Sequence, residues 1–282
     1  MELAVAGPLD LEPTLAWGQS FRWQLDARGR YVGVVGGDVV RLTRTPGGVL
    51  VESAPTPPGE LAEAMAAYLR LDDDLLAIQA RLSADPHVAE GIRAYPGLRM
   101  LRQDPWETLA SFILSQVSNI PRIHHTVEAL ARAFGQPVRL GGTWRRTFPG
   151  PEQVAEAGER RLRRLGCGFR APYLAAAAEA VADGRLRLDA LRGQPYPSVL
   201  EALTGLTGVG DKVADCVMLF ALDRSEAFPA DRWVLRVLRE WYALPERLSY
   251  PAIRAWAQGR FGADAGYANH YLFWRVREES RG

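Results

Sequence analysis

The sequence predicts an α+β protein, in which an N-terminal antiparallel sheet is followed by a mostly helical region. β-Rich runs separated by glycine and proline turns occur at Phe21–Leu25, Tyr31–Leu42 and Val49–Val51, which favours strands joined as hairpins. From about residue 60 onward, apolar residues recur at helical spacing almost to the end of the chain. With 282 residues, 48% of them hydrophobic, the chain can bury a sizeable core in one large or two moderate domains.

The order of elements suggests where the two parts divide. We expect residues 1–100 to form the sheet with flanking helices and residues 101–282 to form the helical region. The proline-rich segment 54–59 is expected to close the sheet. Most later connections carry Gly, Pro or Asp, as helix ends do. The helices predicted in this way are 60–70, 73–83, 86–95, 105–116, 119–134, 152–165, 170–183, 196–204, 211–222, 231–242, 250–261 and 264–278.

The composition restricts the class of site. Two cysteines cannot form an iron–sulfur cluster or a four-thiolate zinc site, and the four histidines lack metal-ligand spacing, so we expect no metal. The net charge of +1 neither favours nor excludes nucleic acid, because local arginine clustering matters more than the total. No apolar run approaches the roughly 20 residues that span a bilayer, and no signal pattern precedes Leu11. A cytoplasmic location without a membrane partner is therefore expected.

Lys212 is the only lysine among the 34 basic residues, the others being arginine. An arginine stays protonated in a protein, whereas a lysine amine can lose its proton and attack an electrophilic carbon. Lys212 also falls at the start of the predicted 211–222 helix, where the positive end of the helix dipole disfavours an ammonium group. It is a candidate nucleophile, and the alternative is a surface lysine left in an arginine-biased composition.

Two further features flank this lysine. Gly208 and Gly210 allow a tight turn whose N–H groups could hold a phosphate, although a plain helix–helix corner would look the same. Asp231 precedes an apolar-periodic run, as a helix N-cap worth about 1 kcal/mol does. A capping carboxylate can also face a cleft, where it could stabilise positive charge on a substrate or help to deprotonate a nucleophile.

The run from Leu203 to Asp231 resembles the helix–hairpin–helix motif and the following Gly/Pro-rich loop of the helix–hairpin–helix DNA glycosylases. In the bifunctional members a lysine attacks C1′ of the sugar and an aspartate assists, and Lys212 and Asp231 match those positions. Thr207 replaces the proline of many members. Further stretches, collinear from about residue 9 to 278, are similar to signatures of 8-oxoguanine DNA glycosylases, among them Gly18-Gln19-Ser20-Phe21-Arg22-Trp23, Leu101-Arg102-Gln103-Asp104-Pro105 and Leu165-Gly166-Cys167-Gly168-Phe169-Arg170-Ala171.

The resemblance implies how a base would be read. A glycosylase moves its target nucleotide out of the duplex into a pocket. Oxidised guanine has an N–H donor at N7 where guanine has an acceptor, and Gly18 matches the family glycine whose carbonyl reads it. Phe273 and Cys216 would sandwich the base, while Asn269 would meet its Watson–Crick edge in place of the glutamine of eukaryotic relatives. Taken singly, these residues could equally belong to a turn or a core.

The resemblance also assigns residues to the opposite strand. Arg122 and Arg170 match arginines that contact the orphaned cytosine, and Phe169 matches an aromatic wedge. The eukaryotic asparagine triplet is reduced to Asn119, and its first position is Val117, whose side chain cannot donate a hydrogen bond. We therefore expect looser discrimination of the opposite base. A surface arginine or a core aromatic is the alternative for each.

Two observations concern the DNA backbone. The densest positive patch, expected to attract phosphates, consists of Arg161, Arg163, Arg164 and Arg170. Trp233 stands where eukaryotic relatives have a phosphate-binding histidine. A solvated helix face would carry the same arginines.

By this resemblance the chain is a bifunctional DNA glycosylase and AP lyase that excises 8-oxoguanine in base excision repair through a Schiff base on Lys212. Its partner would be double-stranded DNA containing oxidised guanine, bound by a monomer. No cofactor is expected, although carbonyl groups of the hairpin could hold a monovalent cation, as in some relatives. The alternatives are an alkylated-base glycosylase, which hydrolyses with water and needs no lysine, and a non-catalytic helix–hairpin–helix DNA-binding protein.

Overall fold

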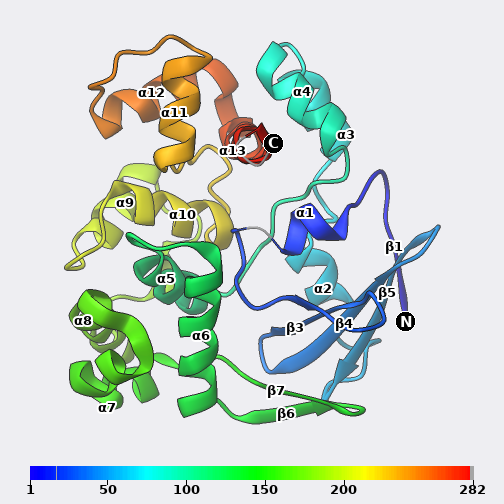
Figure 1. The fold of residues 1–282 in the computed structure, drawn as a ribbon, viewed down its shortest axis with the longest axis vertical. Helices are drawn as coiled ribbons and strands as arrows, with labels where there is room; N and C mark the ends of the chain where they lie inside the picture. The colour runs from blue at the N-terminus through cyan, green and yellow to red at the C-terminus, as the bar shows by residue number, and fades with distance from the viewer. Residues whose placement is uncertain (17, 280–282) are drawn as a thin grey trace.

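The computed structural model describes residues 1–16 and 18–279, in which a five-stranded sheet packs beside a mostly helical region (Figure 1). The strands run antiparallel in the order β1-β5-β4-β3-β2. The predicted α+β class is confirmed. The strand bounds are β1 (Glu2–Ala4), β2 (Gln24–Leu25), β3 (Tyr31–Val35), β4 (Asp38–Arg44) and β5 (Gly48–Ala54).

The N-terminal part differs from the prediction in its local detail. A short helix, α1 (Leu11–Leu15), was not predicted, and only the last two residues of the predicted strand Phe21–Leu25 pair in the sheet. Tertiary packing explains the second difference, because the indole N–H of Trp23 donates to the hydroxyl of Tyr68 at 2.8 Å. Trp23 also covers Gly33, at which a Cβ would come within 2.5 Å of the indole.

Every predicted helix is present, with ends that differ by a few residues. Hydrophobic periodicity and the Gly, Pro and Asp boundaries were therefore sufficient to locate them. Their bounds are α2 (Ala62–Tyr68), α3 (Leu75–Leu82), α4 (Pro86–Ala94), α5 (Pro105–Leu114), α6 (Ile120–Phe134), α7 (Pro151–Leu162), α8 (Ala171–Ala182), α9 (Tyr196–Thr204), α10 (Asp211–Ala221), α11 (Arg232–Glu240), α12 (Tyr250–Phe261) and α13 (Ala265–Glu279).

A β-hairpin interrupts the helical region, which was not predicted. Its strands, β6 (Pro137–Leu140) and β7 (Thr143–Arg146), follow α6 and run beneath the sheet in Figure 1. The hairpin contacts the sheet, since a guanidinium N–H of Arg41 on β4 donates to the hydroxyl of Thr143 at 3.1 Å. Helix α7 ends earlier than predicted because Arg163–Cys167 forms a π-helical turn in which Gly166 has φ +94°.

Polar contacts, some of them buried, join elements that are far apart in the sequence. Arg22, 1% exposed, donates from Nε to the carboxylate of Glu128 on α6 at 2.9 Å. Asp223, just after α10, accepts hydrogen bonds from Arg102 and Arg192, each at 2.7 Å. These contacts fix the relative positions of the elements that surround the site described below. Within the described residues no helix is long and apolar enough to cross a bilayer.

Candidate active site

A pocket of about 690 Å³, here called the central pocket, lies where α5, α6, α10, α11 and α13 meet the loop that carries Gly18. These elements come from widely separated parts of the sequence and converge near the middle of the molecule in Figure 1. The pocket brings together most of the residues that the sequence singled out. Those that line it are Gly18, Val117, Asn119, Arg122, Lys212, Cys216, Asp231, Trp233, Asn269 and Phe273.

Lys212 lies in the first turn of α10, whose following residues are buried, so its backbone is held by the core. Its amine lies 3.4 Å from the hydroxyl of Ser115 and 5.1 Å from the centre of the Phe112 ring, both on or next to α5. No carboxylate of the described residues forms an ion pair with Lys212, whereas many of the arginines are paired. A half-buried amine without a counter-ion is suited to react with a substrate. Ser115 and Phe112 were not assigned roles from the sequence.

Asp231 is the N-cap of α11, which confirms the structural role expected for it. Its Oδ1 accepts both capping bonds, from the backbone N–H groups of Trp233 and Val234, each at 2.9 Å. Because both capping bonds go to Oδ1, the other carboxylate oxygen, Oδ2, is available to a ligand in the pocket. The loop before it is held by Tyr250, whose hydroxyl accepts the N–H of Ala230 at 2.9 Å. The carboxylate is thus fixed in a pocket that it shares with the Lys212 amine.

Cys216, one turn after Lys212, forms part of the pocket wall and is only 2% exposed. Burial raises the pKa of its thiol to about 11, and the opposing effect of the nearby Lys212 amine does not cancel this rise. A thiolate is the reactive form of cysteine, so Cys216 stays an inert, polarisable surface at neutral pH. It does not compete with Lys212 as the nucleophile.

The loop that carries Gly18 is braced by neutral amides. The backbone of Gly18 has φ +103°, and a Cβ there would lie 3.3 Å from the side chain of Ile120. The next residue, Gln19, is 1% exposed and donates to the carbonyls of Thr14 at 2.6 Å and Arg99 at 2.9 Å. The amide of Gln103 donates to the backbone carbonyl of Gln19 at 2.6 Å. These bonds set the direction of the peptide that follows Gly18.

Asn269 and Phe273 share a face of α13, as their spacing predicted, and both line the central pocket. The amide nitrogen of Asn269 donates to the carbonyl of Pro229 at 3.2 Å, which leaves its oxygen for a ligand. His270, between them, also lines the pocket and is 3% exposed. Burial lowers the pKa of its imidazole to about 3, so His270 is neutral at physiological pH. The sequence analysis did not single out this residue.

Phe169 and Arg170 lie outside the lining of the central pocket. Phe169 is 48% exposed, as a wedge would be, and the Arg170 guanidinium lies 4.4 Å from its ring centre. Arg170 is 4% exposed and donates to the backbone carbonyls of Gln116 at 2.5 Å and Val117 at 2.8 Å. Nε and Nη2 of Arg170 are thus bonded to the loop of residues 116 and 117. Only Nη1 is left to contact DNA.

Three of the four arginines expected to form a positive patch at residues 161–170 have contacts within the protein. Arg163 donates to the carboxylate of Glu159 at 2.7 Å, and the Arg161 guanidinium lies 4.5 Å from the ring centre of Phe134. Arg170 turns inward, as described above. Arg163 pairs with a carboxylate one helical turn away, whereas the partners of Arg161 and Arg170 are distant in sequence, and a count of arginines reveals neither.

Gly208 and Gly210 also lie outside the lining of the pocket, in the turn between α9 and α10. Gly208 has φ +81°, and a Cβ there would come within 2.2 Å of the Tyr173 ring on α8. Its carbonyl accepts a hydrogen bond from the amide of Gln116 at 3.0 Å, which ties this turn to the Val117 loop. Gly210 is exposed and is the residue before α10.

We expect Gly208→Ala to lower the free energy of unfolding by about 1–3 kcal/mol, because the new methyl group meets the Tyr173 ring and the backbone conformation is unfavourable for alanine. Denaturant unfolding followed by circular dichroism measures this. Gly210→Ala is the matched control, since a Cβ at Gly210 would have no neighbour within 4 Å. Equal stability of the two variants would contradict the expected clash.

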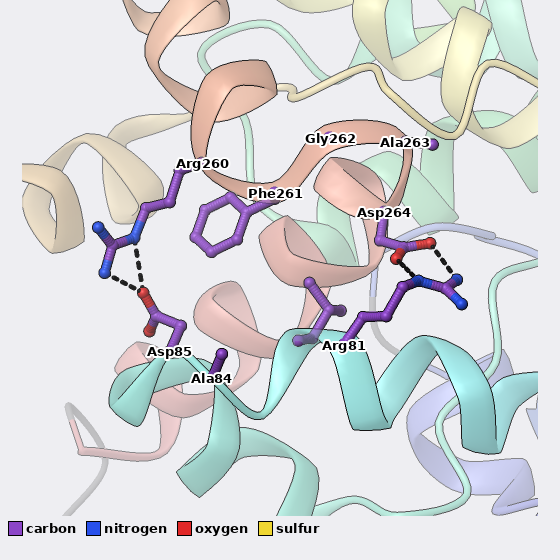
Figure 2. A pocket seen from close by; sticks show the side chains of 9 residues that line it. Arg81, Ala84, Asp85, Arg260, Phe261, Gly262, Ala263 and Asp264 are labelled. Carbon is purple, nitrogen blue, oxygen red and sulfur yellow. Dashed lines mark hydrogen bonds and ion pairs between the residues drawn. The ribbon is translucent and has the colours of Figure 1, made fainter.

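A second hollow, of about 440 Å³, lies between the ends of α3 and α12 (Figure 2). Its two guanidiniums are paired with carboxylates: Arg81 with Asp264 at 2.7 Å, and Arg260 with Asp85 at 2.7 Å. Figure 2 shows these pairs on either side of Phe261. Because the charges are satisfied internally, this hollow lacks the unpaired reactive group that the central pocket contains.

Two family models match the chain. The one described as HhH-GPD superfamily base excision DNA repair protein covers residues 110–260, and the one described as 8-oxoguanine DNA glycosylase, N-terminal domain, covers residues 3–109. The chain therefore belongs to the helix–hairpin–helix superfamily of base excision DNA repair proteins. It is 31% identical over 281 residues to the N-glycosylase/DNA lyase OGG1 of Arabidopsis thaliana, covering 94% of this chain and 76% of that protein. Within the superfamily, the chain belongs to the 8-oxoguanine DNA glycosylase family.

Solved structures agree over the whole fold. The 8-oxoguanine glycosylase/lyase of Clostridium acetobutylicum, in complex with double-stranded DNA containing cytosine opposite to 8-oxoG, gives a TM-score of 0.92 at 30% identity, covering 98% of this chain and 94% of that chain. MBOgg1 in complex with a low-affinity DNA ligand gives a TM-score of 0.93 at 35% identity, covering 98% of this chain and 95% of that chain.

Proposed function

We propose that this chain removes 8-oxoguanine from double-stranded DNA and then nicks the strand at the abasic site. The observation that carries the proposal is the placement of the sole lysine in one pocket with the second carboxylate oxygen of Asp231 and the loop of Gly18, with no counter-ion among the described residues. Membership of the family supports the same activity. The monomeric state and the cytoplasmic location remain predictions.

The proposed reaction begins with attack of the neutral Lys212 amine on C1′ of the extruded nucleotide. The C1′–N9 bond breaks, and the departing base takes up a proton released from the new C–N bond. The Asp231 carboxylate stabilises the positive charge that develops on the sugar. Opening of the sugar ring gives a Schiff base at C1′. Loss of a proton from C2′ then expels the 3′ phosphate by β-elimination, which nicks the strand.

The residues around Lys212 favour this mechanism over the alternatives. An alkylated-base glycosylase would activate water and would not require an amine at this position. A silent DNA-binding module would bind through the hairpin and release no base. Among the described residues the amine of Lys212 has no carboxylate partner, and it contacts Ser115 and Phe112 at the pocket.

The test is an assay of base release and strand nicking on two duplexes that differ only in 8-oxoguanine or guanine at one position. We expect release and nicking with the oxidised base alone. Duplexes containing 3-methyladenine, hypoxanthine or an abasic site separate the alternatives. Release of an alkylated base with 8-oxoguanine left intact would overturn the proposal, as would binding of every duplex without chemistry.

Val117 offers a prediction for the opposite strand. It has φ +48° and its side chain is 87% exposed, a left-handed conformation that a β-branched residue adopts at a cost of about 1–2 kcal/mol. We expect Val117→Asn to raise the preference for cytosine opposite the lesion by about 5- to 10-fold, through one added hydrogen bond. Nicking rates with each of the four opposite bases measure this.

Val117→Gly is the matched control for Val117→Asn, because it relieves the backbone strain without adding an amide. Both variants should be more stable than the parent in thermal unfolding. If the glycine variant sharpens the preference for cytosine as much as the asparagine variant, the backbone rather than the amide sets the selectivity.

A further inference from the structure

The imidazole of His270 is a buried polar group for which the mechanism above has no use. In the unliganded protein its Nε2 is buried at the wall of the central pocket and has no hydrogen-bond partner among the described residues. Its nearest rings are Phe220, edge-on at 6.0 Å, and Phe273, at 6.4 Å and within 7° of parallel. A leucine or phenylalanine would pack there without an unsatisfied polar atom, whose burial is unfavourable. A histidine at this position therefore calls for a polar partner of Nε2, and the described residues supply none.

The position of His270 indicates what that partner is. It lines the central pocket together with Cys216, Asn269 and Phe273. A base stacked on Phe273 would lie parallel to that ring and so nearly parallel to the imidazole. Nearly parallel planes are compatible with a hydrogen bond from an imidazole N–H to a carbonyl group on the edge of the base, which favours donors near its plane.

The chemistry of the neighbouring groups fixes the direction of the bond. The free oxygen of Asn269 is an acceptor, which suits the N–H donors on the Watson–Crick edge of an oxidised guanine. The next atom on that edge is the oxygen on C6, which needs a donor. A neutral imidazole offers one N–H, and burial keeps His270 neutral, with a pKa of about 3.

We propose that His270 is a specificity-determining residue, whose imidazole donates a hydrogen bond to the C6 carbonyl oxygen of the flipped oxidised guanine beside Asn269. This inference rests on the proposed function and extends it. It assigns the reading of the C6 position to a side chain, in addition to the reading of N7 by the Gly18 carbonyl.

The test pairs one protein change with one substrate change. His270→Phe keeps an aromatic ring and removes the donor, and 8-oxo-6-thioguanine replaces the C6 oxygen with sulfur, a weaker acceptor, while keeping the N1 and N7 donors. We expect the parent to excise 8-oxoguanine roughly 10-fold faster than the thio analogue, the value of about one neutral hydrogen bond. His270→Phe should lose that preference by slowing only 8-oxoguanine excision. Nicking of a preformed abasic site, which has no base, should be unchanged.

The outcomes distinguish this inference from the proposed function. If the parent protein releases no 8-oxoguanine, the proposed function fails. If it does so but treats both bases alike, or if the phenylalanine variant retains the preference, His270 does not read C6. A variant that slows base release and abasic-site nicking equally would mark His270 as a packing residue. His125→Phe, at an exposed position of α6 outside the pocket, is the control, and the substrate comparison in the parent stands even if His270→Phe does not fold.

Discussion

Replacing Lys212 with glutamine is expected to abolish the covalent complex that borohydride traps between the protein and an 8-oxoguanine duplex. The amine is the only group of the described central pocket that can form a Schiff base with C1′. Base release should fall on the order of 10³-fold or more, as it does when other covalent enzymes lose their nucleophile. Gel electrophoresis of the reduced reaction, alongside the rate of base release, measures both effects.

Lys212→Arg is the matched variant for this experiment, because it keeps the positive charge and lacks a nucleophilic amine. Its affinity for the duplex should equal that of the parent, so that a loss of trapping cannot be attributed to a loss of binding. A trapped species that persists in both variants would show that another amine reacts, and the N-terminal amine of Met1 would be the remaining source. Absence of trapping in the parent would rule out the Schiff base itself.

Asp231→Asn is expected to slow base excision by about 10²- to 10⁴-fold, the usual contribution of a positioned catalytic carboxylate. Its two roles can be separated, because asparagine caps a helix as well as aspartate does. The Trp233 and Val234 N–H groups would then keep their acceptor. The free energy of unfolding should change by less than about 0.5 kcal/mol. Single-turnover excision rates and thermal unfolding test the two expectations together.

Asp231→Ala completes the comparison. It removes both the charge and the cap, so we expect the same slow excision with an additional loss of about 1 kcal/mol of stability. An asparagine variant that keeps full activity would show that only the cap matters. In that case the development of positive charge on the sugar would need a different stabilising group.

The sequence predicted the elements whose signals are local. Helix ends marked by Gly, Pro and Asp were located within a few residues, and the cap at Asp231 followed from its position before an apolar-periodic run. The β6–β7 hairpin was missed although Gly141 and Gly142 form a two-residue turn between its strands, which is a local hairpin signal. The short helix α1 was missed because its few residues carry little periodicity.

In the candidate site, too, residues with a local signal were predicted and residues placed by long-range contacts were not. Lys212 was noticeable because it is unique, and Asn269 and Phe273 share a face by simple helical spacing. The inward turn of Arg170 was not predictable, because its acceptors are backbone carbonyls of residues 116 and 117, more than 50 positions earlier. His270 was missed because its neighbour Phe220 comes from another helix. Sequence spacing alone does not tell which side of α13 faces a pocket and which faces the core.

Because of the hydrogen bonds around Gln19, we expect the affinity for DNA and the selectivity for the base to depend differently on salt. Attraction between arginines and phosphates weakens as counterions accumulate, so affinity for DNA should fall as salt is raised. The bonds that hold the Gly18 loop join neutral amides and carbonyls, and they carry no net charge for salt to screen. The fraction of DNA bound should therefore differ between low and high salt. The discrimination between 8-oxoguanine and guanine in the bound complex should stay the same.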